Sequence, residues 1–327
     1  MSMRKAFLTG GTGFLGVNVA KIATEEGWDV TALHRPTSDI QYLTRFPVKL
    51  AEGSITDKDS LRRAIPEGTD TIFHVAGDTS LWGPKNAAQY ENNVTGTANI
   101  RDVAIEKGVR RLVVTSSTAA WGDVKGELIE TRPKEGKDSK VNYYRTKHLA
   151  ELEALKGMDQ GLEVVVMNPA VIIGPFDTAT WARVLIMAHT GKWLPVMPGT
   201  ISATHGEEAA RAHVAAADKG RPGENYILGG ANHDWRESME LIFATANRPA
   251  PTLAPPAWLL MGAARVADGI SRITGKEPPV TPDAIAIVSK PTFAHSKKAQ
   301  EELGYKVVPL DKMVKDSYEW LKAEGLI

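Results

Sequence analysis

The 327-residue chain contains no cysteine, which excludes disulfides, thiolate nucleophiles and cysteine-ligated metal sites. It carries no net charge, because 39 basic residues balance 39 acidic ones, so the overall field attracts neither nucleic acid nor an anionic membrane. No stretch approaches the roughly 20 uninterrupted apolar residues of a membrane-spanning helix. Glycines also interrupt the first apolar run too early for a signal peptide. These absences predict a cytoplasmic protein with no nucleic-acid partner and no membrane insertion.

What the chain does contain is an alternation of short apolar runs with longer amphipathic ones in its first half. This alternation is typical of a parallel sheet covered by helices. The runs predict strands at 5–8, 29–33, 48–50, 71–76, 111–115 and 163–167, and helices at 14–26, 93–107 and 143–155.

The sequence pattern changes after about Pro175, where Pro and Gly separate shorter motifs. We therefore predict an α/β fold with a Rossmann-type doubly wound parallel sheet in residues 1–175. A smaller, mostly helical substrate lobe follows in residues 176–327, and parts of 205–245 are expected to pack back on the first domain. The proline-rich segment Asn247–Pro256 is expected to be an ordered connection. We expect 257–264 to form a helix packed in the second lobe rather than a membrane contact; an apolar lid is the alternative.

The segment Thr9–Gly16, TGGTGFLG, places a glycine turn between the first strand and the first helix. Gly11, Gly13 and Gly16 fit the G-x-G-x-x-G fingerprint, while Gly10, Gly13 and Gly16 fit the spacing of short-chain dehydrogenases. Glycines let the backbone approach a pyrophosphate closely at the positive end of the helix dipole. The turn therefore predicts a dinucleotide site without a metal.

The residues that close the second strand, His34-Arg35-Pro36-Thr37-Ser38, include no acid before Asp39. An acid at this point usually holds the ribose 2′-hydroxyl of NAD. Arg35 instead offers a planar fork of donors that matches a 2′-phosphate. We therefore favour NADP(H) over NAD(H); the alternative is that Arg35 simply faces solvent.

Tyr143 and Lys147 are spaced to lie on one face of a helix, a single turn apart. A nearby ammonium favours the phenolate, so we expect Lys147 to lower the pKa of Tyr143 and make it an acid–base group. Ser117 follows the strand at 111–115 and is placed to donate to the substrate oxygen. The three residues predict hydride transfer with Tyr143 handling the proton.

These motifs resemble the extended short-chain dehydrogenase/reductase family. The resemblance rests on TGGTGFLG, on the Asn93–Thr97 run NVTGT, on VVTSST at 113–118, on Tyr143-x-x-x-Lys147 and on Asn168-Pro169-Ala170. The chain is most similar to the dihydroflavonol-4-reductase-like and 3β-hydroxysteroid dehydrogenase-like branch, which includes bacterial hopanoid-associated sugar epimerases.

The resemblance implies that Ser117, Tyr143 and Lys147 are catalytic and that Asn93 supports them; Ser116 or Thr118 supplies the hydroxyl if the register differs by one. It implies further cofactor contacts at Thr12, Phe14, Leu15, Ser54, Ile55, Val75, Ala76, Thr115, Pro169 and Val171. Three positions depart from the family pattern: Ser54 replaces a common aspartate, Gly77 a usual alanine, and the run 204–208 a common Val-Asp-Asp.

Four tryptophans are expected on loops near the substrate cleft: Trp82, Trp121, Trp181 and Trp193. We expect Trp82 and Trp121 to line it beside Ser117 and Tyr143. The favoured function is an NADP(H)-dependent reductase or dehydrogenase that interconverts a carbonyl and an alcohol on a fairly apolar small molecule. The alternatives are an NAD-dependent nucleotide-sugar epimerase or dehydratase and a non-catalytic dinucleotide sensor. The resemblance allows a monomer or a homodimer.

Overall fold

A seven-stranded parallel sheet forms the centre of the protein in a computed structural model, which describes residues 3–192 and 194–327. Its strand order is β10-β7-β5-β4-β1-β2-β3, so the chain runs outward from β1 in one direction and from β4 in the other. This is the doubly wound order of a Rossmann fold, with the reversal of direction between β1 and β4. The predicted fold class is confirmed.

The helices and strands of the sheet domain are β1 (Lys5–Thr9), α1 (Phe14–Glu25), β2 (Asp29–His34), β3 (Lys49–Glu52), α2 (Lys58–Ala64), β4 (Thr71–His74), α3 (Asn86–Tyr90), α4 (Gly96–Glu106), β5 (Arg111–Thr115), α5 (Asn142–Leu155), β7 (Glu163–Pro169), α7 (Gly206–Lys219), β10 (Asn225–Leu228) and α11 (Lys297–Leu303). The remaining elements are β6 (Gly126–Leu128), β8 (Val171–Ile173), α6 (Trp181–His189), β9 (Thr200–His205), β11 (Ala231–Asp234), α8 (Trp235–Thr245), α9 (Ala257–Thr274), α10 (Pro282–Val288), β12 (Thr292–Ala294) and α12 (Leu310–Ala323).

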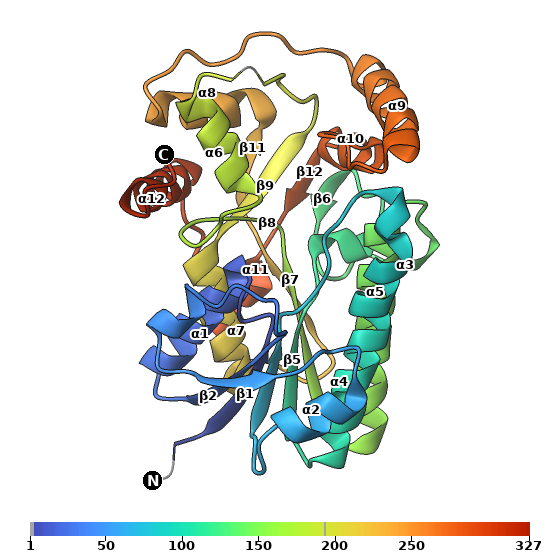
Figure 1. Ribbon diagram of the computed structural model, residues 1–327, viewed down its shortest axis with the longest axis vertical. Helices are drawn as coiled ribbons and strands as arrows, with labels where there is room; N and C mark the ends of the chain where they lie inside the picture. Colours follow the sequence, from blue (N-terminus) through green and yellow to red (C-terminus); the bar gives the residue numbers. More distant parts are fainter. Residues whose placement is uncertain (1–2, 193) are drawn as a thin grey trace.

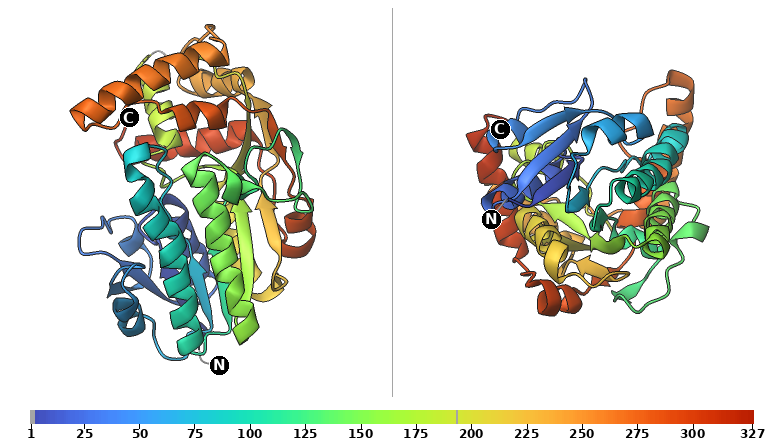
Figure 2. Two further views of the ribbon diagram at one scale, coloured as in Figure 1. Left: turned by 90° about the vertical axis from the view of Figure 1, so that its right-hand side faces the viewer. Right: turned by 90° about the horizontal axis from the view of Figure 1, so that it is seen from below.

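Successive strand residues point to opposite faces of the sheet, so each strand supplies two cores. Val113, Val165 and Met167 pack with α1, α7 and α11 on one face, whereas Val114 and Val166 pack with α2, α4 and α5 on the other. Figure 1 shows the two groups of helices on either side of the sheet, and the right-hand view of Figure 2 shows the same layers from below. Burial on both faces explains why these strands are almost continuously apolar.

The chain after β8 builds a second layer above the carboxyl ends of the strands (Figure 1). A short sheet of order β11-β9-β8 packs with α6, α8 and α12 around its own apolar core. Two later segments return to the first sheet, since β10 pairs with β7 and α7 packs against α1. Within the described residues, no helix is both long and apolar enough to cross a bilayer.

Two predicted elements differ from the structure. The helix expected at 93–107 starts earlier, because α3 leads through one π turn at Glu91–Thr95 into α4. The segment 257–264 was expected to pack in the second lobe, but it begins α9, in which only Ala264 and Ser271 are buried. The helix packs on α10 through these two residues and through Leu260, Met261, Ala267 and Asp268, which are partly buried, while its other residues are exposed.

Candidate active site

The glycine turn closes against the end of β4. Gly10 has φ of +73°, and a Cβ on it would lie 2.5 Å from the Ala76 nitrogen. A Cβ on Gly16 would lie 1.9 Å from the Gly10 carbonyl oxygen. Both positions therefore exclude any side chain, and the turn packs directly on Val75 and Ala76 at the sheet's reversal point.

The start of α1 is open to an anion. Gly13 caps this helix without a side-chain hydrogen bond, and the first turn, which contains Phe14 and Leu15, has no acidic residue. Gly13 is exposed and Thr12 beside it is partly exposed. The backbone N–H groups and the helix dipole thus face outward with nothing to neutralise them, so the residues fit the pyrophosphate of a dinucleotide.

The residues expected near the adenosine end lie beyond β2 and β3. Arg35 is exposed, and no hydrogen bond or ion pair engages its guanidinium in residues 3–192 and 194–327. The Ser54 hydroxyl bonds Thr56 at 2.9 Å, and the Ile55 carbonyl accepts from Asn99 at 3.0 Å. Arg35 is therefore available to a ligand, whereas Ser54 is already engaged within its own turn.

Tyr143, Ser117 and Lys147 meet at the carboxyl edge of the sheet. Tyr143 and Lys147 lie one turn apart on α5, and Ser117 follows β5. The Ser117 hydroxyl lies near enough to the Tyr143 phenol to lower the pKa of that phenol. Lys147 Nζ donates to the Thr115 carbonyl at 3.2 Å, which ties α5 to the end of β5. The predicted trio is brought together by two elements that are adjacent only in the folded chain.

The expected effect of Lys147 on Tyr143 is wrong for this structure. Burial raises the pKa of Tyr143, and the Ser117 hydrogen bond offsets only part of that rise. Burial also lowers the pKa of Lys147 to about 8, opposed by the carboxylates of Glu151 and Asp78. Tyr143 is therefore a neutral phenol at physiological pH, because desolvation disfavours the phenolate.

Asn93 lies in the π turn before α4 and is buried. Its side-chain amide forms two hydrogen bonds with the backbone of Asp78, in the loop after β4. Oδ1 accepts from the Asp78 N–H at 2.6 Å, and Nδ2 donates to the Asp78 carbonyl at 2.9 Å. Nδ2 also donates to the Thr146 hydroxyl on α5 at 3.1 Å. Next to it, a Cβ on Gly77 would lie 3.0 Å from Lys147 Nζ, so the glycine gives that ammonium room.

His74 links the glycine turn to this π turn. Thr97 Oγ1 donates to the Asn93 carbonyl at 2.6 Å, so it accepts from His74 Nε2 at 3.0 Å. His74 Nδ1 then accepts from the Thr9 hydroxyl at 2.7 Å, and Thr9 Oγ1 accepts from the Ala76 N–H. Burial, with a smaller effect of Lys147, lowers the pKa of His74 to about 3. The ring is therefore a neutral connector beneath the site.

Other predicted hydroxyl and cofactor residues lie at the same edge. Ser116 Oγ is buried without a hydrogen-bond partner, while its N–H donates to Met167. Thr118 opens the short helical turn that follows Ser117. Pro169 ends β7 and Val171 starts β8, and the Ser117 hydroxyl donates to the Pro169 carbonyl at 3.4 Å.

The predicted tryptophans separate into different environments. Trp82 is partly exposed, and its Nε1 donates to Ser271 of α9 at 3.1 Å. Trp121 is 1% exposed in an apolar cluster, so it has no surface for a ligand here. Trp181 is not on a loop, because it starts α6 and stacks on Trp235 at 5.6 Å. Trp193 lies outside the described residues.

Sequence reasoning missed a buried ion pair behind the site. Lys134 pairs with Glu151 on α5, and Glu151 Oε1 accepts from Asn168 at 2.6 Å. Lys134 also lies 4.2 Å from the centre of the Trp121 ring. The continuation of the Tyr143, Lys147 spacing to Glu151 was the available signal, since these residues share one helix face.

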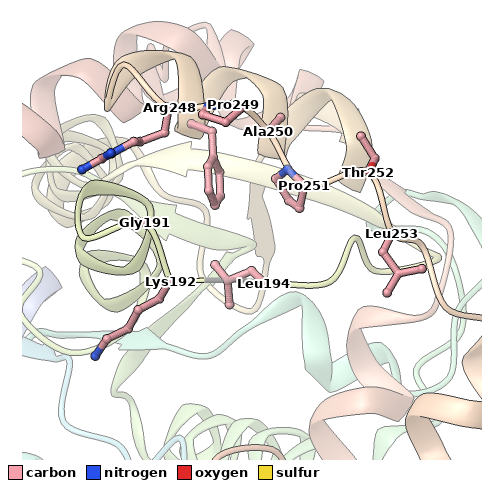
Figure 3. Close-up of a pocket in the computed structure, with 10 residues that line it drawn as sticks. Gly191, Lys192, Leu194, Arg248, Pro249, Ala250, Pro251, Thr252 and Leu253 are labelled. Atoms are coloured by element: carbon pink, nitrogen blue, oxygen red, sulfur yellow. The ribbon is translucent and has the colours of Figure 1, made fainter.

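A hollow of about 390 Å³ lies in the second layer, away from these residues (Figure 3). Lys192, Leu194 and Arg248 are among the residues that line it, and none of the predicted site residues that the structure describes does. Arg248 donates to the His189 carbonyl at 3.3 Å. The hollow is therefore not part of the site around Tyr143. In the described ranges, no group of three or more His, Asp or Glu side chains is arranged to hold a metal.

Comparison with known proteins supplies the remaining findings. Residues 6–229 match the model of the NAD dependent epimerase/dehydratase family. A protein of Synechocystis sp. that is named as a dihydroflavonol 4-reductase is 31% identical, and the match covers 98% of this chain and 95% of the Synechocystis protein. Sterol demethylase protein B of Methylococcus capsulatus is 28% identical over 98% and 99% of the two chains. The crystal structure of gox2253 superposes with a TM-score of 0.84 at 31% identity, covering 98% of both chains.

Proposed function

The chain belongs to the NAD-dependent epimerase/dehydratase family and is an NAD(P)-dependent oxidoreductase, and from this premise we propose an NADP(H)-dependent carbonyl reductase acting on a fairly apolar small molecule. The observation that carries the proposal is that Ser117, a neutral Tyr143 and Lys147 meet at the carboxyl edge of the sheet, with Lys147 one turn from Tyr143 on α5 and bonded to the Thr115 carbonyl. This arrangement suits proton delivery to an oxygen on which negative charge develops.

When bound, the nicotinamide supplies the hydride in reduction and accepts it in oxidation. Tyr143 delivers its proton to the carbonyl oxygen, which its raised pKa allows because the phenol is fully protonated at neutral pH. Ser117 donates a second hydrogen bond to the same oxygen. Lys147 stands one turn away from the phenol, where its charge stabilises the phenolate left after proton transfer. Gly10, Gly13 and Gly16 would hold the pyrophosphate.

Arg35 supports NADP(H) as the cofactor. Its guanidinium is exposed at the end of β2 with no protein partner in the described chain, and no acid stands at this point to bind a 2′-hydroxyl. A bidentate arginine–phosphate contact is stronger than a neutral hydrogen bond. Replacing Arg35 by Gln should weaken NADPH binding about 10- to 100-fold, from loss of charged hydrogen bonds worth about 1.5–3 kcal/mol.

Three observations support an apolar substrate. Ile287 of α10 packs in one apolar cluster with Tyr143. Two arginines that could have gripped a sugar-nucleotide diphosphate are engaged elsewhere, Arg211 with Glu207 and Arg221 with both oxygens of Glu302. The sterol demethylase relative is named for an apolar substrate class. The epimerase alternative rests on the family description, which names epimerases and dehydratases.

The test begins with NADPH and NADH titrations of the purified protein, followed by a panel of apolar ketones and aldehydes read at 340 nm. Tyr143→Phe should bind NADPH normally and lose turnover by at least 100-fold, the range typical of a lost general acid. Arg35→Gln should lose NADPH affinity and keep NADH affinity; Arg183→Gln, an exposed arginine on α6, is the matched control. Preference for NADH, co-purifying NAD and no carbonyl turnover would favour the epimerase instead.

A further inference from the structure

The helix α9 lies at the outer edge of the second layer, above α10 in Figure 1 and along the top of the left-hand view in Figure 2. Its 18 residues bury only Ala264 and Ser271. A helix of a globular protein normally buries its apolar face and leaves the polar face in water. In α9 the side that faces away from the body is apolar as well as the side that packs on it.

Four large side chains form this outward stripe: Leu259, Val266, Ile270 and Ile273. At 3.6 residues per turn they fall within about 60° of one another, roughly opposite the buried Ala264 and Ser271. Their exposed fractions run from 49% for Leu259 to 89% for Ile273. Trp258 adds a 74% exposed indole at the start of the helix, about 100° around the axis from Leu259 and beside the stripe.

Basic residues flank the stripe on one side. Arg265 and Arg272 are seven positions apart, next to the angle of Trp258, and Lys276 follows the end of α9. Arg272 pairs with Asp268, and no partner engages Arg265 within the described residues. The whole chain is electrically neutral, whereas residues 257–277 carry three basic residues against Asp268 and Glu277, which is a small local excess of positive charge.

We propose that α9 binds the surface of an anionic lipid bilayer, with the stripe in the acyl boundary and the cations at the headgroups. An exposed apolar face, flanking arginines and a terminal tryptophan are the features of an interfacial helix. A second copy of the chain fits less well, because it would bring its own arginines to the contact and Asp268 is turned toward the body. The contact is peripheral and requires no spanning helix.

The position of α9 connects such a surface to the catalytic edge. It packs on α10, whose Ile287 shares a cluster with Tyr143, and Ser271 accepts from Trp82 of the loop after β4. Lys85 of that loop pairs with Glu277 just beyond the helix at 2.6 Å. A bilayer under α9 would therefore deliver an apolar substrate next to the site. This last step rests on the proposed function, whereas lipid binding does not.

The test is flotation of the full chain with vesicles of phosphatidylcholine, alone or with phosphatidylglycerol added. The wild-type protein should bind the anionic vesicles more tightly. The double variant Val266→Asp/Ile270→Asp should lose at least tenfold in binding. Each substitution replaces an apolar side chain that would be buried in the bilayer by a carboxylate that stays in water. Arg265→Gln and Arg272→Gln should each lose about fivefold on anionic vesicles only. Ile129→Asp, an exposed apolar residue elsewhere, should bind as wild type.

Two outcomes would overturn the proposal. One is a wild-type protein that floats with neither vesicle; if Val266→Asp/Ile270→Asp then turns a dimer into a monomer in sedimentation, a second copy occupies the stripe. The other is vesicle binding that the double variant retains. Turnover of a water-soluble carbonyl by the double variant checks that it is folded. Failure of carbonyl turnover in the wild type would remove the proposed function and leave the vesicle result standing.

Discussion

Mild acid should destabilise this protein through two buried histidines. His74 lies between the Thr9 and Thr97 hydroxyls, and His213 lies between the Thr115 hydroxyl at 2.9 Å and the Ala209 carbonyl at 2.7 Å. Burial lowers the pKa of His74 to about 3 and that of His213 to about 4. Both rings therefore remain neutral in the folded protein at the pH values at which an exposed histidine starts to bind protons.

The sign and size follow from proton linkage. In the unfolded chain each histidine titrates near pH 6.5. The unfolded state therefore binds more protons than the folded state below about pH 6.5, and the free energy of unfolding falls as the pH drops. Between pH 7.5 and 5, each histidine should remove about 2 kcal/mol from the free energy of unfolding, and the pair about 4 kcal/mol. Paired carboxylates contribute only below about pH 4.5, so stopping at pH 5 isolates the histidines.

Urea unfolding at pH 7.5 and pH 5 measures the loss directly, and NMR of the imidazole rings reports whether both stay neutral. A variant with His213→Gln should be less stable at pH 7.5 but should lose about 2 kcal/mol less on acidification than the wild type, because one proton-binding group is gone; burial also lowers the pKa of His148 and His205, and both contributions stay the same in the two proteins. Equal stability at the two pH values, within about 1 kcal/mol, would refute the reasoning. So would an unchanged pH dependence in the His213 variant.

Three further changes test the packing around the site. Gly16→Ala should abolish NADPH binding in a titration, because its Cβ would lie 1.9 Å from the Gly10 oxygen, whereas Gly262→Ala on α9 meets no atom within 4 Å and should bind normally. Glu151→Gln should lower the free energy of unfolding by about 3–5 kcal/mol by leaving the Lys134 charge buried, and adding Lys134→Met should restore much of it in the same urea assay. Asp177→Ala should lower the melting temperature, because its carboxylate accepts four backbone N–H groups at the start of α6.

The sheet could be predicted because its signals are local. Apolar runs bounded by Gly and Pro identify β1, β2, β5 and β7 within a residue or two. The helix before the catalytic strand was harder, since the π turn at Glu91–Thr95 has no sequence signature and depends on Asn93 reaching the loop after β4. The second layer has short elements whose packing is set by distant partners.

The site, like the fold, has features that local spacing predicts and features that depend on burial. The spacing of Tyr143 and Lys147 predicts one helix face, which is a property of any α-helix. The pKa of Tyr143 was predicted in the wrong direction, because desolvation depends on what covers the phenol and no spacing encodes that. Trp121 was expected to line the substrate cleft but is buried, for a related reason: composition does not tell which indole is buried and which is exposed.

By itself the sequence determined the order of strands and helices, the glycine turn and the pairing of Tyr143 with Lys147. These follow from the periodicity of the backbone and from the steric freedom of Gly10 and Gly16, which act over a few residues. The tertiary structure alone decided that Ser117 reaches Tyr143, that His74 and His213 stay neutral and that α9 turns its apolar stripe outward. Burial and long-range contact create each of these, and both exist only once segments distant in the chain have packed together.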